Sequence, residues 1–314
     1  AQALYHNLNT LESRQGSQVP FTSINLGRDT SPEGRLVTKW MMEASIEGIG
    51  KFHLTSIFPI SIFQYKSGTN ANPEDPNYDL FKLACRVSAK RLFPNFSFLD
   101  APFNAKYYVE GRPETEATYM GCRTRVVGNV CGEEIVSGRG NLSFTTINLP
   151  RLGIKHGSLN GQAMDVQGFY NELDEKIDLV IEQLLERFEV QASKKVKNFP
   201  FLMGQNVWKG SDELGPNDTL REVIKQGTLT VGFIGLAECL IALIGKHHGE
   251  SEEAQKLGLE IITHMRERME EASDKYGLNF SLIATPAEGL SGRFTAIDKK
   301  QYGEIKGITD KEYY

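Results

Sequence analysis

The sequence predicts an α/β fold with a largely parallel, buried sheet or barrel. Short runs of β-forming residues alternate with amphipathic stretches of helical spacing, as in proteins whose parallel strands are joined by helices. Thr55 to Gln64 is an almost continuous apolar run of strand length, which is typical of a strand buried on both faces. No break in composition divides the chain, so we expect one domain over residues 1–314.

The first expected elements lie in the N-terminal third. Val19 to Leu26 is rich in β-formers and predicts a strand. A helix is expected from Pro32 to Gly48, because proline suits the first turn of a helix and glycine its end. Pro76 to Leu92 predicts a second helix, with its proline at the first helical position and Asp75 as the N-cap.

The remaining elements follow an irregular segment, with a loop expected at about residues 110–140. Asn141 to Leu149 alternates in the manner of a strand. A long helix is then predicted by apolar residues at helical spacing, namely Phe169, Leu173, Ile177, Val180, Ile181, Leu184, Leu185 and Phe188. Further helices are expected over Val231 to Ile244 and over Glu252 to Tyr276, the latter capped by Gly277. Asn279 to Ala284 predicts the next strand.

The composition excludes several classes of protein. The chain is 40% hydrophobic and 24% charged, which suits a globular protein with a sizeable core. A net charge of −5 argues against coating nucleic acid or binding a membrane through basic residues. No apolar stretch is long enough to span a membrane. The four cysteines have neither disulfide-framework nor zinc-site spacing, so we expect no metal and a reducing, cytoplasmic compartment.

The most unusual segment is Ala117 to Arg125 (ATYMGCRTR). It places Cys122 between a glycine and an arginine in a non-helical stretch. Arg123 and Arg125 would favour a thiolate if the loop were exposed. A cysteine packed under the loop as a small apolar residue is the other interpretation, because free cysteines are usually buried. Local chemistry leaves both interpretations open.

Two further segments have features of ligand-binding loops. The turn after Asn279 to Ala284 offers backbone N–H groups, two hydroxyl side chains and Gly289, a set that could hold a phosphate. An ordinary strand-to-helix turn is the alternative. Ser13 to Asn25 is a polar loop that runs into a strand, and it could adapt to a ligand or only connect two elements.

Five segments, in one order along the chain, resemble a known family. They are SRQGSQVPFTSINLG, IFPISIFQYKSGTN, TYMGCRTRV, GRGNLSFTTINLPRLG and NFSLIATPAEGLSGRF. These segments are similar to those of the anaerobic (class III) ribonucleoside-triphosphate reductases, and the resemblance runs from about Ser13 to the C-terminus. It implies a ten-stranded α/β barrel of the ribonucleotide reductase and glycyl-radical type, with a finger loop through its centre.

The resemblance also implies roles for individual residues. Cys122 would lie at the tip of the finger loop, where a glycyl radical oxidises the cysteine to a thiyl radical that abstracts the 3′-hydrogen of the substrate ribose. Met120 and Asn141 would line the ribose pocket. The substrate phosphates would be bound by Thr285, Ala287, Glu288, Gly289, Leu290 and Ser291. The specificity loop, which links a bound effector to substrate choice, would consist of Arg14, Gln15, Gly16, Ser17 and Gln18.

The activity that the resemblance implies is the radical-based reduction of ribonucleoside triphosphates to 2′-deoxyribonucleoside triphosphates under anaerobic conditions, with formate as reductant. The parent enzyme would use a glycyl radical, structural zinc and nucleotide effectors (ATP, dATP or another dNTP). Its partners would be a radical-SAM activating enzyme and a second copy of the chain in a homodimer. The alternatives are another glycyl-radical enzyme of the pyruvate formate-lyase type and a non-catalytic nucleotide-binding fragment.

Several family segments are missing between Ala1 and Tyr314. The sequence contains no ATP-cone, no four-cysteine zinc cluster and no Arg-Val-Cys-Gly-Tyr-like glycyl-radical segment. It also lacks an initiator methionine. We therefore expect the central part of a barrel without its first strand or strands, with no cofactor bound in it and no activity alone.

The other cysteines are expected to be structural. Cys131 follows Cys122 by nine residues, and we favour a packing role over that of a redox partner. Cys85 and Cys239 fall in predicted helices, so both are expected to pack in the core.

Overall fold

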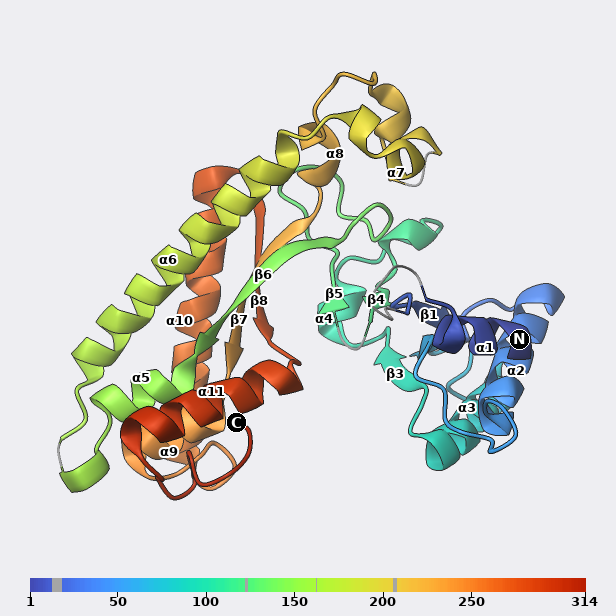
Figure 1. The fold of residues 1–314 in the computed structure, drawn as a ribbon. Helices are drawn as coiled ribbons and strands as arrows, with labels where there is room; N and C mark the ends of the chain where they lie inside the picture. The colour runs from blue at the N-terminus through green and yellow to red at the C-terminus, as the bar shows by residue number, and fades with distance from the viewer. Residues whose placement is uncertain (13–18, 122–123, 162, 206–207) are drawn as a thin grey trace. The chain divides into compact units, whose positions relative to one another are not determined.

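The computed structural model describes residues 1–12, 19–121, 124–161, 163–205 and 208–314 (Figure 1). The chain folds into two compact units. Unit 1 contains residues 1–128 and 134–137, and unit 2 contains residues 129–133 and 138–314. Each unit has its own three-stranded parallel sheet with helices in the connections, which confirms the α/β class. The strands of the described residues form no closed barrel.

Unit 1 is built on a parallel sheet of order β1-β2-β3. Its elements are α1 (Gln2–Thr10), β1 (Ser23–Leu26), α2 (Pro32–Glu47), β2 (Ile60–Tyr65), α3 (Tyr78–Arg91), β3 (Asn95–Phe98), α4 (Pro102–Ala105), a 3₁₀ turn (Pro113–Thr115), β4 (Tyr119–Met120) and β5 (Thr124–Arg125). Side chains from α1, α2, β1, β2 and α3 form its core, among them Tyr5, Met42 and Phe63. β2 is buried along almost its whole length, as its apolar run predicts.

Three starts of elements in unit 1 differ from the sequence prediction. β1 begins at Ser23 rather than Val19. β2 begins at Ile60 rather than Thr55, after Pro59, because proline has no N–H to donate to a ladder. The helix α3 begins at Tyr78, with Asn77 in the N-cap position. The prediction that Asp75 caps this helix was wrong, since its carboxylate accepts the N–H groups of Ala71 and Asn72 at 2.8 and 2.9 Å instead.

Unit 2 is built on a parallel sheet of order β6-β7-β8. Its elements are β6 (Asn141–Asn148), α5 (Leu149–His156), α6 (Val166–Ala192), α7 (Pro200–Gly204), α8 (Arg221–Ile224), β7 (Thr228–Ile234), α9 (Leu236–Ile244), α10 (Glu252–Tyr276), β8 (Asn279–Ala284) and α11 (Glu288–Tyr302), with 3₁₀ turns at Leu159–Gly161, Val196–Asn198 and Ser211–Glu213. The predicted bounds of α10 and β8 are confirmed, and Gly277 caps α10 in the left-handed conformation.

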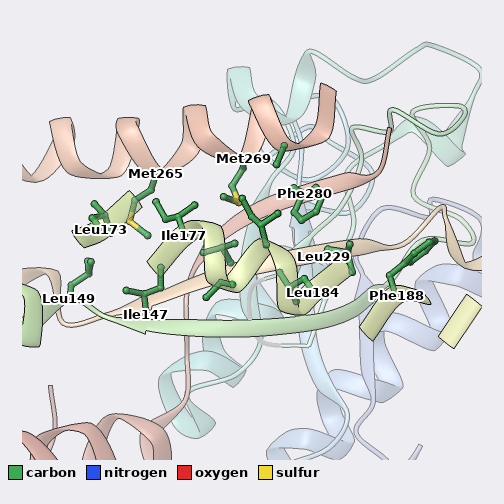
Figure 2. Packing of buried hydrophobic residues seen from close by; sticks show 14 of the residues in the cluster. Ile147, Leu149, Leu173, Ile177, Leu184, Phe188, Leu229, Met265, Met269 and Phe280 are labelled. Atoms are coloured by element: carbon green, nitrogen blue, oxygen red, sulfur yellow. The ribbon is translucent and has the colours of Figure 1, made fainter. Parts of the chain in front are cut away.

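The core of unit 2 lies between one face of this sheet and the helices α6 and α10 (Figure 2). Leu229 and Phe280 project from the strands toward Ile177 of α6 and Met269 of α10. Burial of each such side chain contributes about 1.5–3 kcal/mol. The apolar stripe predicted for the long helix is the face of α6 that enters this core.

The prediction of one helix over Val231 to Ile244 was wrong. The first part of this run is the central strand β7, and only the part after Gly235 is the helix α9. Gly235 has φ +78°, a left-handed conformation that separates the two elements. A continuous apolar run does not distinguish a buried strand from a buried helix, and β7 is buried on both faces.

An ion cluster joins α5 to α6. Glu172 contacts the amino group of Lys155, and its carboxylate lies 2.7 Å from Nε2 of His156. Burial raises the pKa of Glu172, but the hydrogen bonds from these two partners lower the pKa by more, so that it lies below its usual range.

None of the helices in the described part of the chain combines the length and the apolarity needed to cross a membrane.

Candidate functional site

The face of the unit 2 sheet opposite the core carries hydroxyl groups. Side chains of a strand alternate between its two faces. Leu229 and Val231 of β7 enter the core, so Thr228, Thr230 and Gly232 lie on the other face, here called the open face. This face also carries the apolar side chains of Phe144 and Ile283, which pair with Thr230 and Gly232, and it carries no charged residue of β7.

A first hydrogen-bonded row crosses the open face. The hydroxyls of Thr228 and Thr230 donate to Oδ1 of Asn141 at 3.1 and 2.9 Å, and Ser281 Oγ lies 2.8 Å from Thr230 Oγ1. We call these four residues the Asn141 cluster. The side chain of Asn141 is exposed, and no described residue accepts a hydrogen bond from its Nδ2.

An irregularity in β6 turns Asn141 toward this face. The pairing of β6 with β7 shifts register between Asn141 and Ser143, so that Asn141 pairs with Thr228 and Phe144 pairs with Thr230. Without the extra residue, Asn141 and Phe144 would lie on opposite faces, because they are three positions apart. An inserted residue of this kind re-aims a side chain, as β-bulges do near binding sites.

A second row lies one step further along the strands. Thr146 of β6 and Thr285, which follows β8, bring their hydroxyls to 3.0 Å across Gly232 of β7. A Cβ atom at Gly232 would lie 2.1 Å from Thr285 Oγ1 and 2.8 Å from Thr146 Oγ1. The two threonines can therefore meet only because residue 232 is glycine. The N–H of Thr285 also donates to the carbonyl of Phe233 at 2.9 Å, which fixes the start of the following turn.

The turn after β8 is short. α11 begins at Glu288, so the predicted phosphate-binding residues from Glu288 to Ser291 form the first helical turn. No side chain caps the N-terminus of α11, and a Cβ atom at Gly289 would meet nothing within 4 Å. Uncapped N–H groups at a helix N-terminus favour an anion. The hydroxyl of Ser291 is buried and donates to the carbonyl of Tyr314 at 2.8 Å, so Ser291 faces the C-terminal segment.

A buried carboxylate holds α11 in place. Asp298 is fully buried and accepts from Asn148 Nδ2 at 2.7 Å, Arg151 Nε at 2.7 Å and the hydroxyl of Tyr314 at 2.8 Å. Burial, together with the hydrogen bond to Asp298, raises the pKa of Tyr314 above its usual range. This network ties α11 to the end of β6 and the start of α5.

The expected finger loop contains an antiparallel hairpin in unit 1. β4 pairs with β5, Tyr119 opposite Arg125 and Met120 opposite Thr124. The side chain of Asn25 in β1 bonds both the carbonyl and the N–H of Tyr119, at 3.0 and 3.1 Å. Met120 is half-buried in this hairpin.

The structure brings some predicted site residues together and not others. Asn141 and the turn at residues 285–291 both belong to unit 2, whereas Met120 belongs to unit 1. Cys122 and the residues predicted for the specificity loop, Arg14, Gln15, Gly16, Ser17 and Gln18, lie outside the described residues. Arg125 donates to Asn104 Oδ1 at 2.8 Å.

The cysteine predictions are confirmed only in part. Cys239 is fully buried in α9, and burial raises its pKa. Cys85 is exposed on α3, so the prediction that it packs in the core was wrong. Its neighbour Ala84 occupies the buried position of that turn. The thiol of Cys131 is half-buried and donates to the carbonyl of Gly277 at 3.3 Å, and burial raises its pKa.

Sequence reasoning missed Thr230, Gly232, Ser281 and Asp298. The first two were assigned to no element or to a helix, although Thr-Leu-Thr-Val at 228–231 alternates polar and apolar residues in the manner of a strand. In the described residues, no group of three or more His, Cys, Asp or Glu side chains is placed to hold a metal ion.

The fold is that of the anaerobic ribonucleotide reductases. A crystal structure of the Thermotoga maritima enzyme with citrate in the active site matches with a TM-score of 0.60 and 18% identity, over 98% of this chain and 53% of that chain. Another solved anaerobic ribonucleotide reductase matches all of this chain and 46% of its own, with a TM-score of 0.60 and 17% identity. At this identity the likeness shows the fold alone.

The family model described as anaerobic ribonucleoside-triphosphate reductase matches residues 1–314, and the chain belongs to that family. Proteins of that name from Haemophilus influenzae and Escherichia coli are each 32% identical to it, over all of this chain and 42% of theirs. The protein of that name from phage T4 is 33% identical, over all of this chain and 49% of its own. The chain thus spans less than half the length of these relatives.

Proposed function

We propose that this chain is the central part of an enzyme that reduces ribonucleoside triphosphates to 2′-deoxyribonucleoside triphosphates under anaerobic conditions. The proposal rests on the turn between β8 and α11 in a chain that belongs to this family. A hydroxyl-lined sheet face ends there at an uncapped helix N-terminus. Such an arrangement suits a ligand with a polar sugar and a polyphosphate.

The phosphates of the substrate are proposed to bind at Thr285, Ala287, Glu288, Gly289, Leu290 and Ser291. Free backbone N–H groups would hold the anion, and the partial positive charge of the helix N-terminus would add to the attraction. Gly289 would let a phosphate approach the backbone closely. Ser291 contributes no free donor, because its hydroxyl is bonded to Tyr314 and its N–H to the carbonyl of Ala287, so the free N–H groups are those of the helix start before it.

The proposed catalytic residue is Cys122 in the Met-Gly-Cys-Arg-Thr motif. A thiyl radical there would take the hydrogen atom from C3′ of the ribose, which forms an S–H bond and leaves a radical on C3′. The 2′-hydroxyl would then take up a proton and leave as water, formate would supply the two reducing electrons and become CO2, and the cysteine would return its hydrogen atom to C3′. Cysteine suits this step because its S–H bond is weak enough to exchange a hydrogen atom with a ribose carbon. A glycyl radical in another part of the whole enzyme would oxidise this cysteine to the thiyl radical.

The remaining parts of the proposal concern the whole enzyme. We propose that Met120 and Asn141 line the ribose pocket and that Arg14 to Gln18 form the specificity loop for ATP, dATP or another dNTP. A solved Thermotoga maritima relative in complex with dATP and CTP supports nucleotide binding. A ten-stranded barrel in one catalytic domain, structural zinc, a radical-SAM activating enzyme and a homodimer complete the proposal. The two parallel sheets support the barrel.

The catalytic proposal is tested in the full-length enzyme with Cys122→Ala. We expect turnover to be abolished while ribonucleoside-triphosphate binding, measured by titration calorimetry, is kept. Cys85→Ala is the matched control, because Cys85 is exposed and should leave turnover unchanged. Retained turnover in Cys122→Ala would refute the assignment. A folded full-length enzyme that binds no ribonucleoside triphosphate would favour the pyruvate formate-lyase type.

The phosphate turn is tested with Gly289→Ala, compared with Gly204→Ala. Both positions have open space and neither has a left-handed φ, so both variants should fold. We expect the Kd of the triphosphate to rise about tenfold only for Gly289→Ala, equivalent to about 1.4 kcal/mol. An equal Kd in both variants would remove Gly289 from the binding site.

A further inference from the structure

We infer that Thr230 and Ser281 are positioning residues that hold the amide of Asn141 in one orientation, with Nδ2 presented to the substrate. The inference rests on the proposed function, in which Asn141 lines the ribose pocket. It concerns side chains on two other strands, β7 and β8.

The direction of the hydrogen bonds follows from the donors available. A threonine hydroxyl has one proton. Thr230 gives its proton to Asn141 Oδ1 at 2.9 Å, so it accepts the proton of Ser281 at 2.8 Å. A row of donors therefore runs from Ser281 through Thr230 to Asn141. Hydrogen bonds in a row strengthen one another, so Ser281 adds to the hold on Asn141 without touching it.

Thr228 is less suited to hold the amide of Asn141. Its hydroxyl lies 3.1 Å from Asn141 Oδ1, but it also lies 3.4 Å from the carbonyl of Gly140 and can share its proton between the two. Thr230 can keep its proton for Asn141 because its other hydroxyl partner, Ser281, can donate to it, and Thr230 is almost fully buried, which shields its bond from water. Thr230 is therefore the residue whose loss should release the amide.

The held orientation determines what Asn141 can recognise. Both threonine hydroxyls occupy Oδ1, and Nδ2 is left without an acceptor among the described residues. The exposed end of the side chain is then a hydrogen-bond donor only. It suits a ligand oxygen that accepts a hydrogen bond, such as the oxygen of a sugar hydroxyl that donates its own proton to another group. If the amide turned over, it would present an acceptor to that oxygen and lose the contact.

The irregularity in β6 is an independent observation in favour of this role. It places Asn141 on the open face beside the hydroxyls, where regular pairing of the strand would not. The backbone pairing of β6 with β7 and of β7 with β8 does not involve these side chains. Strand pairing alone therefore does not account for the row of hydroxyls, whereas a role in orienting the amide of Asn141 does.

The experiment is a double-mutant cycle in the full-length enzyme. Thr230→Val removes the hydroxyl at nearly constant shape, and Asn141→Ala removes the group on which it acts. We expect Thr230→Val to lower kcat by about tenfold, a size typical of one hydrogen bond, with a smaller change in KM. In the Asn141→Ala background, the same substitution should have no further effect on kcat. Thr230→Ser should restore kcat, since it keeps the hydroxyl.

A matched control separates positioning from a merely structural role. Thr145→Val makes the same change in the same sheet, at a threonine whose hydroxyl donates to Gln183 of α6 at 2.7 Å. It should leave kcat unchanged, and both valine variants should unfold at similar temperatures. Ser281→Ala offers a second variant if Thr230→Val fails to fold, and it should lower kcat by a smaller factor that again disappears without Asn141.

The outcomes distinguish the inference from the proposed function. A wild-type enzyme without ribonucleotide reduction would refute the proposed function, and the inference with it. An active wild type in which Thr230→Val lowers kcat equally with and without Asn141 would refute the inference alone. Unchanged kcat in both Thr230→Val and Ser281→Ala would do the same.

Discussion

Adding one methyl group at Gly232 tests how the sheet of unit 2 brings two threonines together. In the variant Gly232→Ala, the new Cβ atom would lie 2.1 Å from Thr285 Oγ1 and 2.8 Å from Thr146 Oγ1. Non-bonded heavy atoms are comfortable at about 3.5 Å, so the Thr285 hydroxyl must retreat by about 1.4 Å. It cannot do so and keep its 3.0 Å contact with Thr146.

The cost follows from three contributions. Loss of the hydrogen bond between the threonines costs about 0.5–1.5 kcal/mol, and overpacking costs about 1–3 kcal/mol. Alanine in a strand recovers about 0.5–1 kcal/mol of the entropy that glycine loses on folding. We therefore expect Gly232→Ala to lower the free energy of unfolding by about 0.5–4 kcal/mol, with Tm falling by about 2–4 °C for each kcal/mol.

The assay is a thermal scan of four proteins: wild type, Gly232→Ala, Thr285→Ala and the double variant. Removing the Thr285 hydroxyl takes away the closest obstacle, because its Cβ lies 3.4 Å from the added atom. The methyl group should then cost less than half as much as in the wild type. Gly140→Ala is the control, since its Cβ would meet nothing within 4 Å. A Tm for Gly232→Ala equal to that of the control, or additive effects in the double variant, would refute this reasoning.

Three further predictions concern groups outside the open face. Because the pKa of Glu172 is lower in the folded than in the unfolded chain, Glu172 stabilises the fold fully above its unfolded pKa of about 4.3, and this stabilisation is lost as the pH falls through its folded pKa. Glu172→Gln should therefore flatten the dependence of Tm on pH below about pH 4.3. Asp298→Asn should destabilise the chain by about 1.5–3 kcal/mol in urea titrations, since a buried carboxylate loses its charge, and an unchanged midpoint would contradict the network. Iodoacetamide should modify Cys85 in the native chain and leave Cys239 unmodified until urea is added, as mass spectrometry of the peptides would show.

Local patterns predicted the elements whose signals are complete in the sequence. α10 has an N-cap serine, an apolar stripe and a C-terminal glycine, and its bounds were predicted to the residue. The strand β8 follows directly and was predicted equally well. The strand β7 was missed because its sequence runs without a charge into α9, and only the left-handed Gly235 divides them.

The candidate site was only partly predictable, because its contacts depend on strand order. Thr230 can form hydrogen bonds with both Asn141 and Ser281 only if β7 lies between β6 and β8. That strand order depends on packing among residues more than a hundred positions apart. Cys85 shows a smaller limit of the same kind. It was expected in the core because it falls in a helix, but the buried face of that helix contains Ala84 and Val87 and not Cys85. The predicted roles of Cys122 and of Arg14 to Gln18 stay predictions.

The route of the chain between residues 128 and 138 bears on how the protein can be divided. The chain passes between the two units three times in this stretch. Val136 donates its N–H to the carbonyl of Glu114 in unit 1 at 2.8 Å, while Val130 donates to Asn279 Oδ1 in unit 2 at 2.8 Å. An expressed fragment that ends at residue 128 would therefore lack residues 134–137, which belong to unit 1. A fragment that starts at residue 138 would lack residues 129–133, which belong to unit 2. A boundary for separate expression has to duplicate residues 129–137 rather than cut within them.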